Sequence, residues 1–130
     1  MESECPPLLL VVEDEAAILM HAEQSFKDAG YDIIVANASQ DALALLNDEK
    51  NKLAGIVTDI RLGDSISGWE VARHARERHP HIAVIYMTAD SAADWSAHGV
   101  PKSALVQKPF VKAQLLSAMA TLLNDSQLCS

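Results

Sequence analysis

Short apolar runs alternate along this chain with segments whose apolar residues recur at helical spacing. None of the runs alternates strictly between apolar and polar residues, which is typical of strands that are covered on both faces. The pattern therefore predicts a sheet buried between layers of helices. The five runs are "LLLVV" at 8–12, a weaker "DIIVA" at 32–36, "GIVTD" at 55–59, "AVIYMT" at 83–88 and "ALVQ" at 104–107.

Helical stripes fill the gaps between these runs. The stretch "SAADWSAHG" reads as a further short helix, because Ser91 can cap its start and Gly99 can end it. Five strand and helix units with short connections predict an α/β fold, a doubly wound parallel sheet with right-handed crossovers and helices on both faces. The stripes consist of Ile18, Ala22, Phe26 and Ala29; of Ala42, Leu45 and Leu46; of Val71, Ala72 and Ala75; and of Leu115, Met119, Leu122 and Leu123.

The length and composition of the chain limit its organisation. At 130 residues, 49% of them hydrophobic, the chain has enough apolar residues for one core, since single domains commonly contain roughly 100 to 200 residues. We expect a flexible N-terminus at 1–7, one domain at 8–123 and a tail at 124–130. Cys5 and Cys129 show no CxxC spacing, so free thiols are expected.

Charge and hydropathy argue against two classes of partner. Eighteen acidic residues against ten Lys and Arg give a net charge of -8, and the basic residues are scattered, so we expect no direct binding to nucleic acid. No apolar run approaches the roughly 18 residues of a membrane span. The start "MESECPP" also lacks the features of a signal peptide. We therefore expect a cytoplasmic protein without membrane contact.

Polar residues follow the predicted strands at the edge where parallel sheets of this kind bind ligands, beyond the carboxyl ends of the strands. For one acid after one strand, a helix cap or a solvated loop is the more common role, and Asp14 is also placed to cap the helix that follows it. Several such residues at one edge favour a binding site instead. They are Glu13 and Asp14 after the first strand, Asp59 at the third, Thr88 at the fourth and Lys108 after the fifth.

The residue types at this edge indicate the chemistry. Three carboxylates that lie together repel one another and need a cation, and ligands that are all oxygen suit Mg²⁺. Lys108 and Thr88 suit an anion beside that ion, the lysine as a point charge and the threonine as a hydrogen-bond donor. A phosphoryl group is the anion that most often accompanies Mg²⁺. Asp59 can then both bind the metal and attack phosphorus, which gives an aspartyl phosphate.

Four stretches, "LLLVVEDE", "GIVTDIRL", "VIYMTA" and "LVQKPF", together resemble the receiver domain of two-component response regulators over about residues 8–123. The resemblance implies a flavodoxin-like fold with five parallel strands in the order 2-1-3-4-5. It also implies that Asp59 is the phosphoacceptor and that Thr88 and Lys108 hold the phosphoryl oxygens. A cis bond between Lys108 and Pro109 belongs to the same family pattern.

The metal ligands are implied by the same resemblance. Asp14, Asp59 and the backbone carbonyl of Arg61 are expected to ligate Mg²⁺, and Glu13 is expected to complete the acidic pocket through water. The implied protein is a signalling phosphoprotein rather than an enzyme that turns over a separate substrate, because it would catalyse only its own phosphorylation and dephosphorylation.

The implied function is that of a single-domain response regulator. It would take a phosphoryl group from a sensor histidine kinase or a histidine phosphotransfer protein, as in a phosphorelay. Output through contact with a downstream protein is expected, because no further domain follows the fifth helix. A phosphorylation-independent interaction module of receiver type is the alternative. A phosphohydrolase is less favoured, because Arg61 stands two residues after Asp59 where a general acid would be needed.

Three features depart from the family pattern. Gly63 replaces the usual proline, and Gly68 comes nine rather than eight residues after Asp59, which predicts an altered loop. Leu105 stands where the family usually has a Tyr or Phe, so the switch positions Thr88 and Leu105 lack their aromatic partner. The segment between the fourth and fifth strands is shorter than usual, which predicts a reduced fourth helix.

Residues outside the shared motifs add three hypotheses. Arg61 lies two residues after Asp59 and Asp90 two residues after Thr88, so we hypothesise an exposed Arg61 and Asp90 pair that gates access to Asp59. Two independent solvated charges are an equal alternative. We also expect Trp69 and Trp95 to pack against the core, with Trp95 as an alternative anchor for a partner. The third expectation is that the histidines are solvated, namely His21, His74, His79, His81 and His98.

Overall fold

The computed structural model describes residues 6–62, 66–89 and 99–126. Apart from Gly99, the helix predicted in "SAADWSAHG" lies outside these ranges, as do Gly63 and Trp95. Within them the chain forms β1 (Leu8–Val12), α1 (Ala16–Asp28), β2 (Asp32–Ala36), α2 (Ser39–Asn47), β3 (Leu53–Asp59), α3 (Gly68–Arg78), β4 (Ala83–Thr88), β5 (Ser103–Gln107) and α5 (Lys112–Ser126).

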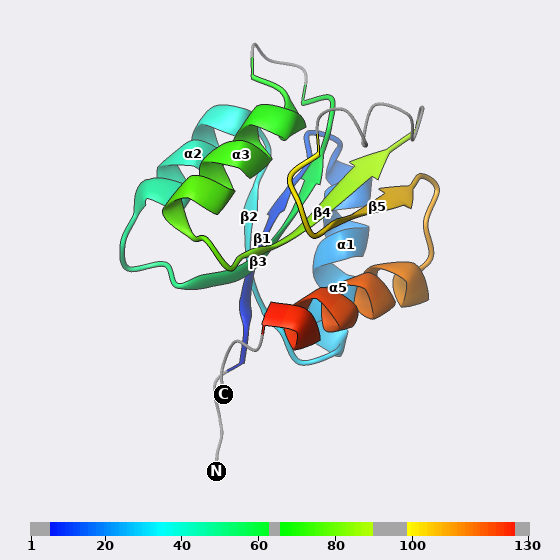
Figure 1. Cartoon of the computed structure of the whole chain (residues 1–130). Coiled ribbons are helices and arrows are strands. Elements are labelled where there is room, and N and C mark those ends of the chain that lie inside the picture. The colour runs from blue at the N-terminus through cyan, green and yellow to red at the C-terminus, as the bar shows by residue number, and fades with distance from the viewer. Residues whose placement is uncertain (1–5, 63–65, 90–98, 127–130) are drawn as a thin grey trace.

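The strands form one parallel sheet in the predicted order, β2-β1-β3-β4-β5 (Figure 1). The chain leaves β1 for β2 at one side and then crosses to β3 at the other side of β1. The strand order therefore reverses beside β1, and sheets of this kind bind their ligands at the carboxyl ends of the strands near such a point. The doubly wound fold class is confirmed.

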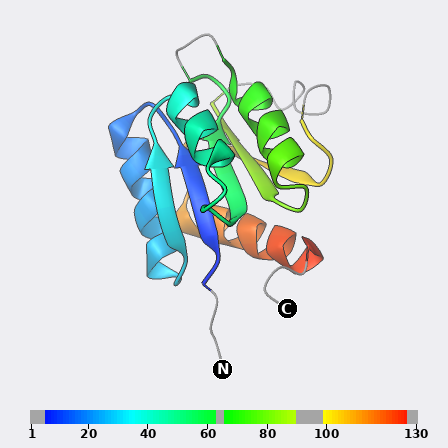
Figure 2. The same cartoon turned by 90° about the vertical axis from the view of Figure 1, so that its left-hand side faces the viewer.

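The helices cover both faces of the sheet, α2 and α3 on one face and α1 and α5 on the other (Figure 1, Figure 2). Successive strand residues alternate between the two cores, so Ile56 packs under α2 and α3 whereas Val57 packs under α1 and α5. Every residue of β3 and β4 is buried. This double burial explains why the apolar runs in the sequence are continuous.

The helix ends differ in part from the predictions. α1 begins at Ala16 with Glu15 as its N-cap residue and no side-chain cap, so the predicted capping role of Asp14 is wrong. The backbone N–H of Glu15 instead donates to Glu13 Oε2 at 3.1 Å. α5 extends to Ser126, three residues beyond the predicted domain end at 123. No helix in the described ranges has both the length and the apolar character needed to cross a bilayer.

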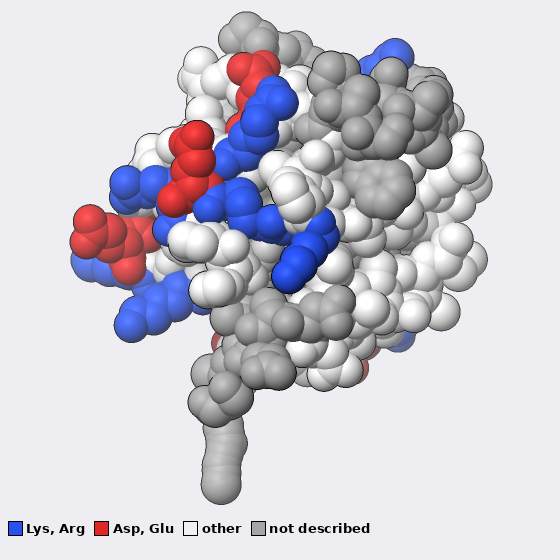
Figure 3. Space-filling model, viewed as in Figure 1, with Lys and Arg blue, Asp and Glu red and all other residues white. Residues whose placement is uncertain are grey.

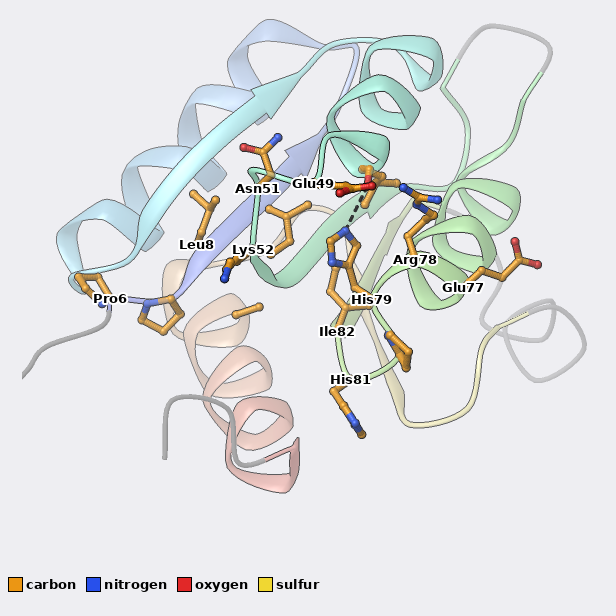
Figure 4. A pocket seen from close by; sticks show the side chains of 15 residues that line it. Pro6, Leu8, Glu49, Asn51, Lys52, Glu77, Arg78, His79, His81 and Ile82 are labelled. Atoms are coloured by element: carbon orange, nitrogen blue, oxygen red, sulfur yellow. Dashed lines mark hydrogen bonds between the residues drawn. The ribbon is translucent and has the colours of Figure 1, made fainter.

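A pocket of about 690 Å³ lies at the amino ends of the strands, beside the starts of β1, β3 and β4 (Figure 4). His79 Nε2 lies 3.2 Å from the carbonyl oxygen of Leu46, and Arg78 donates to that of Asn47 at 3.3 Å. Both side chains therefore bind carbonyl groups that the end of α2 leaves without helical partners. His79 is half-buried, so the expectation of a solvated histidine is wrong there.

Candidate functional site

The polar residues predicted at the sheet edge lie together in the structure. The liganding atoms of Glu13, Asp14 and Asp59 lie within 4.8 Å of one another. Glu13 and Asp59 are 1% and 7% exposed, whereas Asp14 is exposed. Oxygen donors gathered in this way match the ligands that Mg²⁺ takes in proteins. The donor set therefore fits the expected metal.

Two backbone hydrogen bonds position Glu13 and Lys108 just beyond the ends of their strands. The N–H of Glu13 donates to Ala36 at the end of β2 at 3.1 Å, and that of Lys108 donates to the carbonyl of Thr88 at 2.7 Å. The Lys108–Pro109 bond is cis, as the family resemblance implied. Backbone hydrogen bonds thus hold Glu13 and Lys108 beside the carboxyl ends of the strands.

Lys108 contacts both buried acids. Its Nζ lies 2.9 Å from Glu13 Oε1 and 3.3 Å from Asp59 Oδ2, and its side chain is 14% exposed. Glu13 Oε1 is buried. Apart from its ion pair with Lys108, it has no hydrogen-bond partner among the described residues. One ammonium group beside three carboxylates leaves excess negative charge. The cluster can therefore accept a further cation.

Burial shapes the ionisation of this cluster. It raises the pKa of Glu13 and of Asp59, and the contacts with Lys108 oppose this only in part. The backbone N–H of Arg61 also hydrogen bonds to the Asp59 carboxylate and lowers its pKa. Burial lowers the pKa of Lys108, but its contacts with Glu13 and Asp59 outweigh this effect and raise the pKa overall. A cation bound by the carboxylates would favour their ionised forms.

The remaining predicted residues are placed as follows. Thr88 is 6% exposed and follows Met87, which pairs with Asp59 across β3 and β4. Arg61 is exposed just after β3. Asp90 lies outside the described residues, so the gate formed with Arg61 stays a prediction. Leu105 is half-buried and packs against the core under α2 and α3.

Gly68 has a role that the sequence analysis missed. Its N–H donates to the carbonyl oxygen of Ile60 at 2.8 Å, so α3 begins directly against the end of β3. A Cβ atom at position 68 would overlap the carbonyl oxygen of Asp59 and lie 2.8 Å from the Cα of Ile60. The sequence signal was a glycine at the very start of a helix, which we interpreted only as a shifted family position.

These features define a class of α/β domain, in which a parallel sheet of order 2-1-3-4-5 gathers acidic residues, a threonine and a lysine at its carboxyl edge. Residues 9–120 match a family model described as the response regulator receiver domain. The chain belongs to this family, whose members are signalling domains.

Curated relatives are longer proteins. The chain is 33% identical over 128 residues to the alginate biosynthesis transcriptional regulatory protein AlgB of Pseudomonas aeruginosa, covering 97% of this chain and 28% of AlgB. It is 27% identical over 124 residues to the alkaline phosphatase synthesis transcriptional regulatory protein PhoP of Bacillus subtilis, covering 94% of this chain and 50% of PhoP. The chain thus spans between about a quarter and a half of these relatives. Single-domain status and the absence of a nucleic-acid partner stay predictions.

Solved structures show the same fold. A response regulator receiver protein from Sinorhizobium medicae superposes with a TM-score of 0.90 at 36% identity, covering 93% of this chain and 97% of that one. The chemotaxis protein CheY4 of Vibrio cholerae gives a TM-score of 0.80 at 22% identity, covering 91% of this chain and 99% of that one. The second likeness supports the fold alone.

Proposed function

We propose that Asp59 accepts a phosphoryl group from a phosphohistidine donor and that the domain then signals to a protein partner. The observation that carries this proposal is the buried contact of Asp59 with Lys108 beside Glu13 and Asp14. In the transfer, a carboxylate oxygen of Asp59 forms a bond to phosphorus while the P–N bond of the donor breaks. The imidazole nitrogen leaves with the electron pair of that bond.

The side chains have separate tasks in this step. Asp59 must be ionised to attack, and the positive charge of Lys108 at 3.3 Å favours that form. We assign to Lys108 and Thr88 the binding of the phosphoryl oxygens, as a point charge and as a hydroxyl donor. Burial of Asp59 restricts access of water to the acyl phosphate.

Mg²⁺ is the proposed cofactor. Asp14, Asp59 and the backbone carbonyl of Arg61 would hold it, with Glu13 acting through water. When bound, the ion supplies positive charge that neutralises the phosphoryl oxygens. The gathered carboxylate oxygens support this assignment.

The proposed partners are a sensor histidine kinase or a histidine phosphotransfer protein as donor and a downstream protein as target, in the cytoplasm and without nucleic-acid contact. A phosphorylation-independent interaction module remains the second candidate, because position 105 holds a leucine where the family usually has an aromatic residue. A target that binds the phosphorylated and unphosphorylated forms with equal affinity would favour that second candidate.

Incubation with acetyl phosphate tests the proposal. We expect the protein to gain one acid-stable, hydroxylamine-labile phosphoryl group in the presence of Mg²⁺ and almost none with excess chelator. Peptide mapping after reductive trapping of the acyl phosphate should locate the modification at Asp59. Labelling at another residue, or no labelling at any Mg²⁺ concentration, would refute the proposed function.

Lys108→Ala is expected to separate phosphorylation from output. The variant loses the ammonium group that contacts Glu13 and Asp59, so we expect it to fold and bind Mg²⁺ but to capture its partner equally with and without phosphorylation. Affinity capture from lysate, comparing both forms, measures this. Lys112→Ala is the matched control, because Lys112 pairs with Asp28 on the surface. Phosphorylation-dependent capture by Lys108→Ala would contradict the assigned role.

A further inference from the structure

Tyr86 joins the centre of the sheet to a distant part of the chain. The residue lies in β4 and is 0% exposed. Its hydroxyl oxygen accepts a hydrogen bond from the backbone N–H of Val100 at 3.0 Å. Since a buried ring has little freedom to move, this bond fixes the position of Val100 relative to β4.

The anchored segment, which we define as residues 99–102, is also held by α3. Arg76 donates from Nη1 to the carbonyl of Pro101 at 2.6 Å and from Nη2 to that of Lys102 at 3.4 Å. Lys102 has a φ of 57°, a left-handed conformation that is uncommon for a lysine. Side chains of β4 and α3 together therefore determine the shape of this segment.

Tyr86 is connected with the acceptor site along its own strand. Thr88 follows two residues later, so the alternation of β4 places both side chains on the same side of the sheet. Thr88, to which we assign the binding of phosphoryl oxygens, therefore lies on the same strand and the same side of the sheet as Tyr86.

Tyr86 is connected with the acceptor site through α3 as well. Its ring lies 4.7 Å from that of Trp69, measured between centroids, with an angle of 55° between the rings. The predicted packing of Trp69 against the core is thereby confirmed. Trp69 follows Gly68, which approaches the carbonyl of Asp59 so closely that no Cβ fits there. Two direct contacts therefore link Asp59 with Tyr86, the first between Asp59 and Gly68 and the second between Trp69 and Tyr86.

Leu105 cannot hold the anchored segment by a side-chain hydrogen bond as Tyr86 does. Leu105 pairs with Tyr86 across β4 and β5 and is half-buried. A leucine side chain has no polar atom that could bind the N–H of Val100. The aromatic ring with a hydroxyl group lies instead on the neighbouring strand.

We propose that Tyr86 couples the state of Asp59 to the anchored segment, so that phosphorylation of Asp59 changes the conformation of residues 99–102. This proposal rests on the proposed function of Asp59. The adjoining surface of α3 carries exposed charges of both signs, among them Arg73 and Glu77, and Figure 3 shows basic and acidic side chains interspersed on this side of the molecule.

Tyr86→Phe tests the coupling, because it removes the hydroxyl group and keeps the ring against Trp69. Amide spectra of the ¹⁵N-labelled protein are recorded with and without beryllofluoride and Mg²⁺, which mimic the phosphoryl group. In the wild type we expect shifts at Arg61 and Lys108 and also at Val100 and Lys102. In the variant, the shifts at the first pair should persist and those at the second pair should fall to less than half.

Two further measurements separate coupling from a structural effect. Without beryllofluoride, the amide of Val100 should exchange with solvent about fivefold faster in Tyr86→Phe, as expected for a lost hydrogen bond. Tyr31→Phe is the matched control, because Tyr31 is half-buried against Phe26 under the opposite helices. It should leave both pairs of shifts unchanged.

The outcomes distinguish this proposal from the proposed function. Wild-type shifts at Arg61 and Lys108 without shifts at Val100 and Lys102 would overturn the coupling and leave the acceptor chemistry standing. Undiminished shifts at Val100 and Lys102 in Tyr86→Phe would also overturn it. A wild type that shows no shift at either pair would refute the acceptor site itself, and the coupling with it.

Discussion

Asp59→Asn is expected to abolish phosphoryl labelling completely and, at neutral pH, to raise the melting temperature of the metal-free protein. Labelling is lost because an amide has no ionised oxygen to attack phosphorus. Stability rises because a buried charge beside Glu13 and Asp14 is removed while Lys108 keeps its ion pair with Glu13. We expect a gain on the order of 1 kcal/mol, or roughly 3 to 6 °C.

The direction of the pKa shift supports this sign. Burial raises the pKa of Asp59 in the folded protein above its unfolded value. A carboxyl group of this kind contributes stability below the unfolded pKa, and the contribution is lost as the pH rises through the folded pKa. The difference in melting temperature between the wild type and Asp59→Asn should therefore become smaller as the pH falls toward about 4. Thermal melts at several pH values measure it.

Metal binding should stabilise the wild type more than Asp59→Asn. A ligand that binds only the folded state stabilises it by RT ln(1 + [L]/Kd), and the wild type keeps the carboxylate that the variant lacks. Millimolar Mg²⁺ is thus expected to raise the melting temperature of the wild type more than that of Asp59→Asn. Equal shifts, or none in the wild type, would count against the proposed metal site.

A surface aspartate provides the control for this comparison. Asp28 is exposed and its pKa is lowered by contacts with Gln24 and Lys112. Asp28→Asn should therefore leave labelling and the response to Mg²⁺ unchanged and should not stabilise the protein. If Asp28→Asn and Asp59→Asn changed the melting temperature alike, the effect would reflect net charge rather than the buried site.

Local sequence patterns predicted the strands well, because double burial produces apolar runs with clear ends. β3 begins two residues earlier than predicted, at Leu53, since the glycine at position 55 interrupts the apolar pattern without ending the strand. The gathering of Glu13, Asp14 and Asp59 was also predictable, because parallel strands bring their carboxyl ends to one edge. Residues at or directly after the ends of β1 and β3 were sufficient to predict the acidic cluster.

Contacts between distant segments were not predictable in this way. The bond from Val100 to Tyr86 joins residues 14 positions apart on separate elements, and no local pattern encodes it. The same holds for His79, whose contact with Leu46 depends on how α2 and α3 end beside each other. From the sequence alone, such polar residues are predicted to be solvated, because their hydrogen-bond partners come from segments that are distant in the sequence.

Gly68→Ala is expected to destabilise the protein by about 3 kcal/mol or more and to reduce the rate of labelling by acetyl phosphate. The added Cβ would overlap the carbonyl oxygen of Asp59 and would lie 2.8 Å from the Cα of Ile60. Backbone atoms cannot turn away as a side chain can, so α3 or the end of β3 must move. Excess volume in packed regions commonly costs about 1 to 3 kcal/mol, and occasionally more. Urea denaturation and the initial labelling rate measure the two effects.

Gly55→Ala is the matched control, because it also adds one methyl group to a buried glycine. Its Cβ would lie 2.9 Å from Leu9 Cδ2 and from Met119 Cε, which are the ends of flexible side chains. These atoms can shift, so Gly55→Ala should cost less than Gly68→Ala and should leave the labelling rate nearly unchanged, since position 55 lies far from the carboxyl end of β3. Equal losses of stability in the two variants would show that α3 is not fixed against Asp59 by close backbone contact, and would remove one of the two routes by which we connect Asp59 with Tyr86.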